Sequence, residues 1–230
     1  MLEDPLSYLP CSAISEFRKG HVIYDSEPPQ HPFLVIEGCV KVSRPAGHSE
    51  VVINLCQADD FFGEPAFVHA YGERAVTLEP TRVMSWQADV VRDLILRHPQ
   101  LGIALIQSLA HRCHDLGQRM ATLSAEPTTR RLAKALVDLS ERLGEPDAGS
   151  DSGRRLSPYP HRVLAQYIGT TREAVTHCMN EFRRQGFVSY TRRDLIVRGD
   201  AVRDWLAGTV TPRQPLTPEV PQNLPGTLSA

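Results

Sequence analysis

Short apolar runs alternate with turn-forming residues over the first third of the chain. From about residue 13 to residue 90 the runs are rich in valine, isoleucine and aromatic residues, and glycine, proline, aspartate or a His-Ser pair separates them. They cover residues 21–27, 32–38, 39–47, 50–57, 74–80 and 81–87. Short strands at regular intervals predict an antiparallel barrel or sandwich.

The spacing becomes helical near Val90. Residues 90–124 keep helical periodicity with one break at His98–Pro99, and Pro99 suits the first turn of a new helix. Beyond the break, a seam recurs every three or four positions and consists of Leu105, Leu109, Arg112, Leu116, Met120 and Leu123. A helix of this length needs a partner face to persist. The seam therefore packs on its own domain or, as we favour, on the same helix of a second copy.

The next segment predicts another helix, followed by a loop. Residues 124–143 have helical spacing, and either Thr128 or Thr129 is expected to cap the helix. Residues 144–155 are polar and rich in glycine and aspartate, which predicts a flexible loop.

Residues 161–184 predict two short helices joined by a tight turn. Gly169 should end the first helix, because glycine adopts the left-handed conformation of a helix stop at little cost. Thr170 is then expected to cap the second helix, with Glu173 completing a capping box. The side chains expected to face inward are Leu164, Ala165, Ile168, Val175, Cys178, Met179 and Phe182. This pattern is typical of a helix-turn-helix unit.

In such a unit the second helix enters the major groove of DNA, and its first side chains meet base edges. The candidates are Thr170, Thr171, Arg172, Glu173, Thr176 and His177. An arginine can bind guanine in a bidentate manner, and a glutamate can accept from the cytosine amino group. Phosphate contacts are expected from Arg183, Arg184, Arg192 and Arg193. Short strands at residues 188–190 and 195–197 predict a wing beside the helices.

The charge distribution supports an anionic partner. The net charge is −2, yet residues 154–198 hold nine arginines and three acidic residues. Such asymmetry indicates a basic module that binds an anion, although a solvated basic face would have the same composition. Double-stranded DNA is therefore the predicted partner.

Composition and motif content argue against several other classes of protein. The five cysteines are scattered and contain no C-x-x-C pair, which argues against a disulfide framework, and no metal site is predicted. No apolar run approaches the roughly 20 residues that span a bilayer, and the N-terminus lacks a secretory apolar segment. We expect a cytoplasmic protein without a membrane partner. The chain shows no nucleophile–base set and no phosphate-binding loop, so we expect that it is not an enzyme.

Residues 61–76 contain a second candidate site. Backbone amides after Gly63 can hold a phosphate, and Arg74 can pair with it, while Glu64 can accept from a ribose hydroxyl. Taken alone, these residues favour a turn at Gly63 and an internal ion pair between Glu64 and Arg74.

Together, the strand-rich region, the seam helix and the winged helix-turn-helix resemble the cyclic-AMP receptor protein/fumarate-nitrate regulator (CRP/FNR) family of bacterial transcription factors. The motifs that carry the resemblance are residues 164–188 and the cassette GEPAFVHAYGERA. The resemblance implies an α+β fold with an N-terminal cyclic-nucleotide-binding-like antiparallel β-roll. It implies domains at 1–97 (effector), 98–125 (dimerisation helix) and 126–205 (DNA binding). Residues 206–230 are predicted to be a disordered tail, because the C-terminal segment has five prolines and little to bury.

The resemblance also implies partners and roles. It implies a homodimer joined along the seam helix, and RNA polymerase as a further partner. It places Arg172, Glu173 and His177 at base-reading positions. Cyclic-AMP-responsive members have arginine at the position of His177, which leaves the half-site open at that base pair.

The expected effector pocket consists of Gly63, Glu64, Arg74, Ala75, Leu116 and Gly117. It departs from the cyclic-AMP pattern, in which serine or threonine follows the arginine and a Thr-Ser pair occupies the positions of Leu116 and Gly117. Losing three polar groups removes several hydrogen bonds of about 0.5–1.5 kcal/mol each. The sequence therefore argues against cyclic AMP and leaves another cyclic nucleotide, or no effector, open.

Other members of the family sense iron–sulfur clusters, haem or redox state. Only Cys11 lies near the N-terminus, which argues against a cluster. The haem candidates by placement are His69, His111, Cys113 and His114. Oxidation of Cys178 could disturb DNA docking, although its spacing favours a core residue. A nucleotide-binding module whose winged helix contacts protein is a further alternative.

Overall fold

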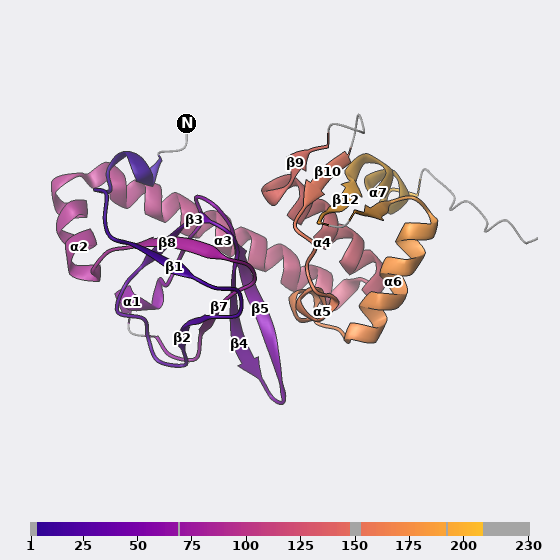
Figure 1. The fold of residues 1–230 in the computed structure, drawn as a ribbon, viewed down its shortest axis with the longest axis horizontal. Coiled ribbons are helices and arrows are strands. Elements are labelled where there is room, and N and C mark those ends of the chain that lie inside the picture. The colour runs from indigo at the N-terminus through magenta and orange to yellow at the C-terminus, as the bar shows by residue number, and fades with distance from the viewer. Residues whose placement is uncertain (1–3, 69, 148–152, 192, 209–230) are drawn as a thin grey trace, which may run out of the picture.

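The computed structural model describes residues 4–68, 70–147, 153–191 and 193–208. A β-roll forms one lobe, a long helix runs out of it, and a smaller helical lobe lies at the other end (Figure 1). Arg192, one of the predicted phosphate contacts, and residues 209–230 of the predicted tail lie outside the described residues. The α+β fold expected from the sequence is confirmed.

Two four-stranded antiparallel sheets make the β-roll. The first has the order β1 (Ile14–Phe17), β8 (Thr81–Ser85), β3 (Phe33–Glu37) and β6 (Phe61–Phe62). The second has the order β2 (Val22–Asp25), β7 (Arg74–Thr77), β4 (Val40–Ala46) and β5 (Ser49–Cys56). All six predicted strands are present. The sequence pattern did not single out β1 and β6.

Apolar side chains between the sheets hold the roll together. In β7, burial alternates along the strand, so that Ala75 and Thr77 face inward. The same cluster contains Val35, Val40, Val42, Cys56, Phe62 and Val83. The short helix α1 (Pro65–Val68) follows β6.

Two helices lead out of the roll. Helix α2 (Ala88–Arg97) ends at His98, and α3 (Pro99–Ala125) begins with Pro99 in its first turn, as predicted. At 1.5 Å per residue, the 27 residues of α3 extend about 40 Å. Within the described part of the chain, no helix is both long and apolar enough to cross a membrane.

The C-terminal lobe surrounds α4 (Thr128–Leu143). It contains α5 (His161–Ile168), α6 (Arg172–Arg184), α7 (Gly199–Leu206) and a sheet with the order β11 (Val188–Tyr190), β12 (Leu195–Arg198), β10 (Gly153–Leu156) and β9 (Glu145–Pro146). The predicted wing is present as β11 and β12.

Three local predictions for this lobe are wrong. Residue 127, a proline, precedes α4 without a side-chain cap, so neither Thr128 nor Thr129 caps it. Strand β9 and all of β10 except Leu156 lie within the segment predicted as a loop. Pairing of β10 with β12 and of β9 with β10 stabilises an arginine-rich segment that has little apolar alternation. Leu206, the first residue of the predicted tail, ends α7.

One apolar cluster joins the two lobes. Cys39, Val52 and Leu55 of the roll pack in the same cluster as Leu132 of α4 and Leu164 of α5. The C-terminal lobe is therefore docked on the roll through a buried contact, and not only connected to it by the chain.

Candidate nucleic-acid interface and effector region

The turn between α5 and α6 has the geometry predicted for a helix-turn-helix. Gly169 has φ of +66°, and the N–H of Thr170 donates to the carbonyl oxygen of Ala165 at 2.9 Å. Ala165 and Val175 are buried where the two helices pack. The small side chain of Ala165 permits this close approach.

The cap of α6 lies one residue later than predicted. The N–H of Ala174 donates to Oγ1 of Thr171 at 3.2 Å, so Thr171 is the N-cap and Thr170 belongs to the turn. Glu173 is then the second helical residue and does not form a capping box. The positive end of the helix dipole stabilises its carboxylate, which is exposed and free to contact a partner.

One face of α6 is polar and open to solvent, and the opposite face is buried. The exposed residues are Arg172, Glu173, His177, Asn180, Arg183 and Arg184. The buried ones are Val175, Cys178, Met179 and Phe182, as predicted. Asn180 was missed by the sequence reading, although it lies one turn beyond Thr176 and His177. Arg184 pairs with Glu181.

Thr176, predicted to read bases, is instead held within the protein. Its Oγ1 donates to the carbonyl oxygen of Arg172 at 2.9 Å and lies 2.9 Å from Nδ1 of His161. Since the hydroxyl has one proton, we assign the proton of that contact to Nδ1. The other ring nitrogen of His161 then accepts from the Tyr190 hydroxyl at 3.4 Å. His161 therefore joins α5, α6 and the wing.

The wing turn presents Arg193 to solvent. The turn is closed by Thr191, whose N–H donates to the carbonyl oxygen of Asp194 at 2.9 Å. The backbone N–H of Arg193 donates to Oγ1 of Thr191, which leaves the Arg193 guanidinium exposed.

In the cassette, the predicted ion pair between Glu64 and Arg74 is wrong. Glu64 pairs with Arg112 of α3, and the same guanidinium donates to the carbonyl oxygen of Phe61 at 2.6 Å. Burial raises the pKa of Glu64 above its ordinary value, and the Arg112 charge partly offsets this. The long helix thus supplies the partner that the sequence spacing could not reveal.

Arg74 binds carboxylates of its own sheet. It lies 3.2 Å from Asp25 and 3.1 Å from Glu50. Lys41 also contacts Glu50, and despite partial burial these two cations hold the pKa of Glu50 below its ordinary value. Ala75 is fully buried within the sheet. The arginine expected to bind a phosphate is therefore neutralised by neighbouring side chains.

The predicted seam of α3 is split between two faces. Leu105 packs towards Trp86 and Arg112 binds Glu64, so both face their own subunit. Leu116 is half-buried. The other predicted seam residues, Leu109, Met120 and Leu123, are exposed. Met120 also belongs to a second set that is exposed at steps of three and four, which we call the α3 stripe: Ile103, Ile106, Ala110, Cys113, Gly117 and Met120. Ile106 and Met120 are each 67% exposed.

Arg119 connects α3 to both lobes. Its guanidinium donates to the carbonyl oxygens of Val52 and Ile53 in β5 at 2.6 Å each, and to that of Tyr167 in α5 at 2.8 Å. It also stacks over the Tyr167 ring at 3.8 Å. Burial lowers the pKa of Arg119. Four interactions from one side chain thus tie the roll to the first helix of the helix-turn-helix.

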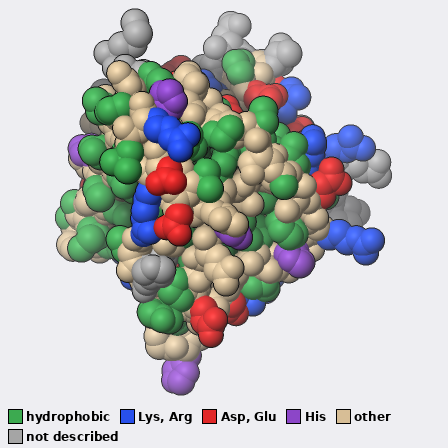
Figure 2. All heavy atoms as spheres, turned by 90° about the vertical axis from the view of Figure 1, so that its left-hand side faces the viewer, with side chains coloured by type: hydrophobic (Ala, Val, Ile, Leu, Met, Phe, Trp, Pro, Cys, Tyr) green, Lys and Arg blue, Asp and Glu red, His purple; other side chains and the backbone are tan. Residues whose placement is uncertain are grey.

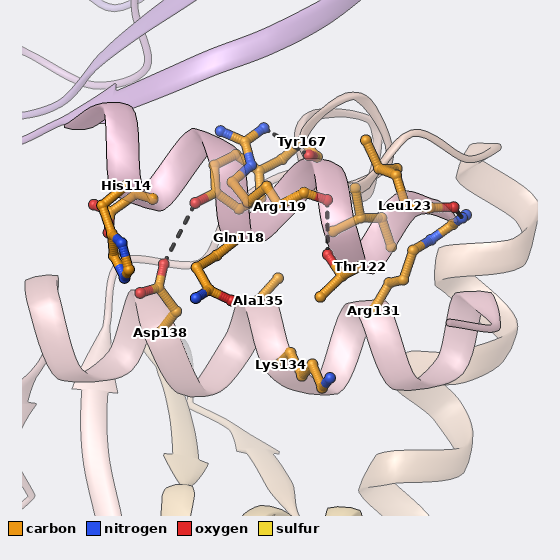
Figure 3. Close-up of a pocket in the computed structure, with 12 residues that line it drawn as sticks. His114, Gln118, Arg119, Thr122, Leu123, Arg131, Lys134, Ala135, Asp138 and Tyr167 are labelled. Atoms are coloured by element: carbon orange, nitrogen blue, oxygen red, sulfur yellow. Dashed lines mark hydrogen bonds between the residues drawn. The ribbon is translucent and has the colours of Figure 1, made fainter. Parts of the chain in front are cut away.

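A cleft of about 360 Å³ lies between α3 and α4 beside this contact. Gln118 of α3 and Asp138 of α4 line it, and the Tyr167 hydroxyl donates to Asp138 at 3.4 Å, whereas the Arg119 guanidinium turns out of the cleft towards the roll (Figure 3). The joint between the lobes therefore combines the apolar cluster with a partly polar cleft.

The haem and redox candidates that the structure describes do not form one ligand set. His111, Cys113 and His114 are exposed on α3, and His69 lies outside the described residues. Among the residues the structure describes, no group of three His, Cys, Asp or Glu could hold a metal ion. Cys178 is buried, with its sulfur 3.5 Å from Oγ1 of Thr129.

Both lobes match known families. Residues 14–98 match the family model of the cyclic nucleotide-binding domain, and residues 130–201 match that of the Crp-like helix-turn-helix domain. The chain belongs to the CRP/FNR family of transcription regulators. Its order of domains is that of the family, and its DNA-binding lobe is the part that gives the family its activity.

The relatives of this chain include regulators with different names and tasks. A CRP-like cAMP-activated global transcriptional regulator of Mycobacterium tuberculosis is 26% identical over 187 residues, which covers 79% of this chain and 82% of the relative. A global nitrogen regulator of Synechocystis is 26% identical, covering 78% and 81%. FixK2 from Bradyrhizobium japonicum shares the fold, with a TM-score of 0.74, 19% identity and coverage of 85% and 97%. The family membership therefore leaves the effector of this chain open.

Proposed function

We propose that the protein is a homodimeric, sequence-specific DNA-binding transcription regulator and not an enzyme. The observation that carries this proposal is the face of α6, which presents Arg172, Glu173 and His177 to solvent while its other face is buried. Side chains at the start of a recognition helix lie where base edges can be reached.

Different residues of this lobe have different roles in the proposal. Arg172 and His177 read bases, together with Glu173 and Asn180. Thr170 and Thr171 lie at the turn, where backbone and hydroxyl groups can contact phosphate. Arg183, Arg184 and Arg193 supply phosphate contacts, and Arg192 is assigned the same role from sequence. Thr176 acts indirectly, by holding His161.

The dimer is proposed to form along the α3 stripe. Ile103 and Ile106 expose apolar surface towards one end of the stripe and Met120 does so at the other, and the small residues between them permit close approach of a second helix. A seam spaced at three and four is the pattern of paired helices. Two copies would then carry two recognition helices, as a palindromic site requires.

The proposed domains are an effector region at 1–97, a dimerisation helix at 98–125 and a DNA-binding region at 126–205, with RNA polymerase and a cytoplasmic setting implied by the family. The effector pocket departs from the cyclic-AMP pattern. Glu64 and Arg74 are paired with Arg112, Asp25 and Glu50, so a cyclic nucleotide would have to break these ion pairs.

Selection from a randomised duplex library, followed by anisotropy titrations at several salt concentrations, tests this function. The wild-type protein should enrich a palindromic site. Arg172→Ala should weaken binding to the selected site by about 1–3 kcal/mol and relax the preference at one base pair of each half-site. Arg193→Ala should weaken binding to all duplexes and reduce the salt slope by about 1.

Arg18→Ala is the matched control, because Arg18 is exposed on the β-roll, away from α6. It should leave affinity, specificity and salt slope unchanged. Enrichment of no sequence, with equally weak binding to every duplex, would contradict the proposal and favour a protein partner for the winged helix.

A further inference from the structure

An apolar cavity lies where α2 and the first half of α3 meet the β-roll. Its volume is about 330 Å³, within the range of small-molecule sites in proteins. Phe61, Phe67 and Trp86 line it from the roll, and Val91, Ile95 and Leu105 line it from the helices. The α2 end of the molecule shows hydrophobic side chains among charged ones (Figure 2).

The polar side-chain groups on its wall are few and mostly engaged. The carboxylate of Glu64 is paired with Arg112, and Nε1 of Trp86 donates to the carbonyl oxygen of Pro10 at 2.9 Å. Ser108 supplies a hydroxyl. A water molecule needs two to four polar partners to be held in a cavity, which this wall offers only sparsely. If the cavity stays empty, its apolar side chains lack the dispersion contacts that an occupant would provide. The cavity is therefore suited to an apolar occupant.

The charge at its edge selects against ions. Arg112 is the cation nearest to the Glu64 wall, and it is already neutralised by that carboxylate and bound to the Phe61 carbonyl oxygen. An anionic ligand would have to break this pair, and a cationic ligand would have to displace Arg112. A neutral molecule leaves the pair intact.

The cavity shares its wall with the helix that ties the lobes together. Leu105, Arg112 and Arg119 are spaced by seven residues, which places them on one face of α3. Leu105 lines the cavity, Arg112 closes its polar edge, and Arg119 binds β5 and α5. A molecule pressing on Leu105 therefore acts on the same face that holds the C-terminal lobe.

We propose that this cavity is the effector site of the protein, and that it takes a neutral, largely aromatic or aliphatic small molecule. Occupancy shifts α3 and so changes how Arg119 holds the helix-turn-helix against the roll. The binding step stands independently of the proposed function, whereas the effect on DNA affinity rests on it.

The neutral fluorophore 1-N-phenylnaphthylamine, titrated into the full-length protein, tests the site. Its emission should rise on binding, with energy transfer from Trp86. The chain has two tryptophans, and Trp205 lies in the C-terminal lobe against Phe182 and Phe187. Trp86→Phe should abolish most of the transfer, and Trp205→Phe should retain it. Transfer that survives in Trp86→Phe would place the probe elsewhere and overturn the proposal.

Two neighbouring residues of α2 give a matched pair that does not depend on Trp86. Ile95→Trp fills the cavity and should weaken probe binding at least about tenfold, a loss near 1.4 kcal/mol. Leu96→Trp adds the same side chain outside the cavity, where Leu96 is 80% exposed, and should bind like wild type. Equal affinity in both variants, or no binding by wild type up to the solubility of the probe, would overturn the assignment.

The coupling is read from DNA affinity with and without saturating probe. A change of at least about threefold in wild type that is lost in Ile95→Trp supports the effector role. Probe binding with unchanged DNA affinity overturns that role. Absence of specific DNA binding by the probe-free protein is a failure of the proposed function, and it is seen separately from the fluorescence result.

Discussion

Gly63 and Gly47 share a left-handed backbone conformation but differ in their surroundings. Their φ angles are +83° and +60°. A Cβ atom on Gly63 would lie 2.8 Å from the carbonyl oxygen of His31 and 2.9 Å from the ring of Phe33, whereas one on Gly47 would meet nothing within 4 Å. The close approach at Gly63 gives this glycine a structural role that is independent of any phosphate.

Alanine substitution at these two sites should therefore have unequal effects. Each variant incurs the left-handed cost of about 1–2 kcal/mol. Gly63→Ala should lose at least about 1 kcal/mol more free energy of unfolding than Gly47→Ala, because backbone must move to admit the methyl group. Urea denaturation measures both values. Equal losses would mean that the β6–α1 turn relaxes freely around position 63.

His161 joins three elements of the DNA-binding lobe and is held as a neutral ring. Partial burial lowers its pKa below the ordinary value, and the charge of Arg172 lowers it further. Because the unfolded chain binds the proton more readily, this residue stabilises the fold fully above its unfolded pKa of about 6.5. The contribution is lost as the pH falls through the folded pKa.

Removing the Arg172 charge should raise the folded-state pKa of His161 towards its unfolded value, so that the loss of stability at low pH becomes smaller and is complete at a higher pH. An NMR titration of the imidazole Cε1 proton in wild type and Arg172→Ala measures the shift directly. Arg162→Ala is the control, since Arg162 is exposed on α5 next to His161 but is not a source of the shift. An unchanged pKa in Arg172→Ala would mean that burial alone depresses it.

At the scale of elements, α3 shows which features a local sequence pattern predicts and which it does not. Its start at Pro99 and its length follow from the sequence, because periodicity and proline are local signals. Its interface does not follow, because two faces both carry side chains at steps of three and four. Arg112 entered the predicted seam by spacing, while Cys113 and Gly117 were assigned to other candidate sites and Ala110 was not singled out.

The other elements divide in the same way. The turn at Gly169 and the wing strands were predicted, since each depends on residues within a few positions of it. The identity of the α6 cap was not, because Thr170 and Thr171 are adjacent and both suit the role. The partners of Glu64 and Arg74 depend on residues 48 and 24 positions away along the chain, which no local spacing encodes.

At the scale of the whole molecule, a charge introduced into the α3 stripe should disrupt the proposed dimer. Ile106→Glu places a carboxylate within the apolar contact, where desolvation is costly, and should convert the dimer to a monomer. Size-exclusion chromatography with light scattering measures the mass. Leu96→Glu is the control, because Leu96 is 80% exposed on α2, outside the stripe.

A monomeric Ile106→Glu variant should also lose most of its affinity for a palindromic duplex, since each subunit would bind one half-site alone. A wild-type protein that is monomeric at micromolar concentration, or an Ile106→Glu variant that stays dimeric, would place the interface elsewhere.

The three hydrogen bonds of Arg119 all end on main-chain oxygens. Replacing the side chains of Val52, Ile53 or Tyr167 leaves those acceptors in place, so the three hydrogen bonds do not depend on which side chains these positions carry, although Val52 also packs in the apolar cluster and the Tyr167 ring stacks on Arg119. The guanidinium itself has no substitute in this set of hydrogen bonds, because lysine offers no planar fork to reach two neighbouring carbonyl groups of β5 and one of α5. Such a joint would let residues of the effector region change during evolution, and with them the ligand, while that region stays attached to the DNA-binding lobe.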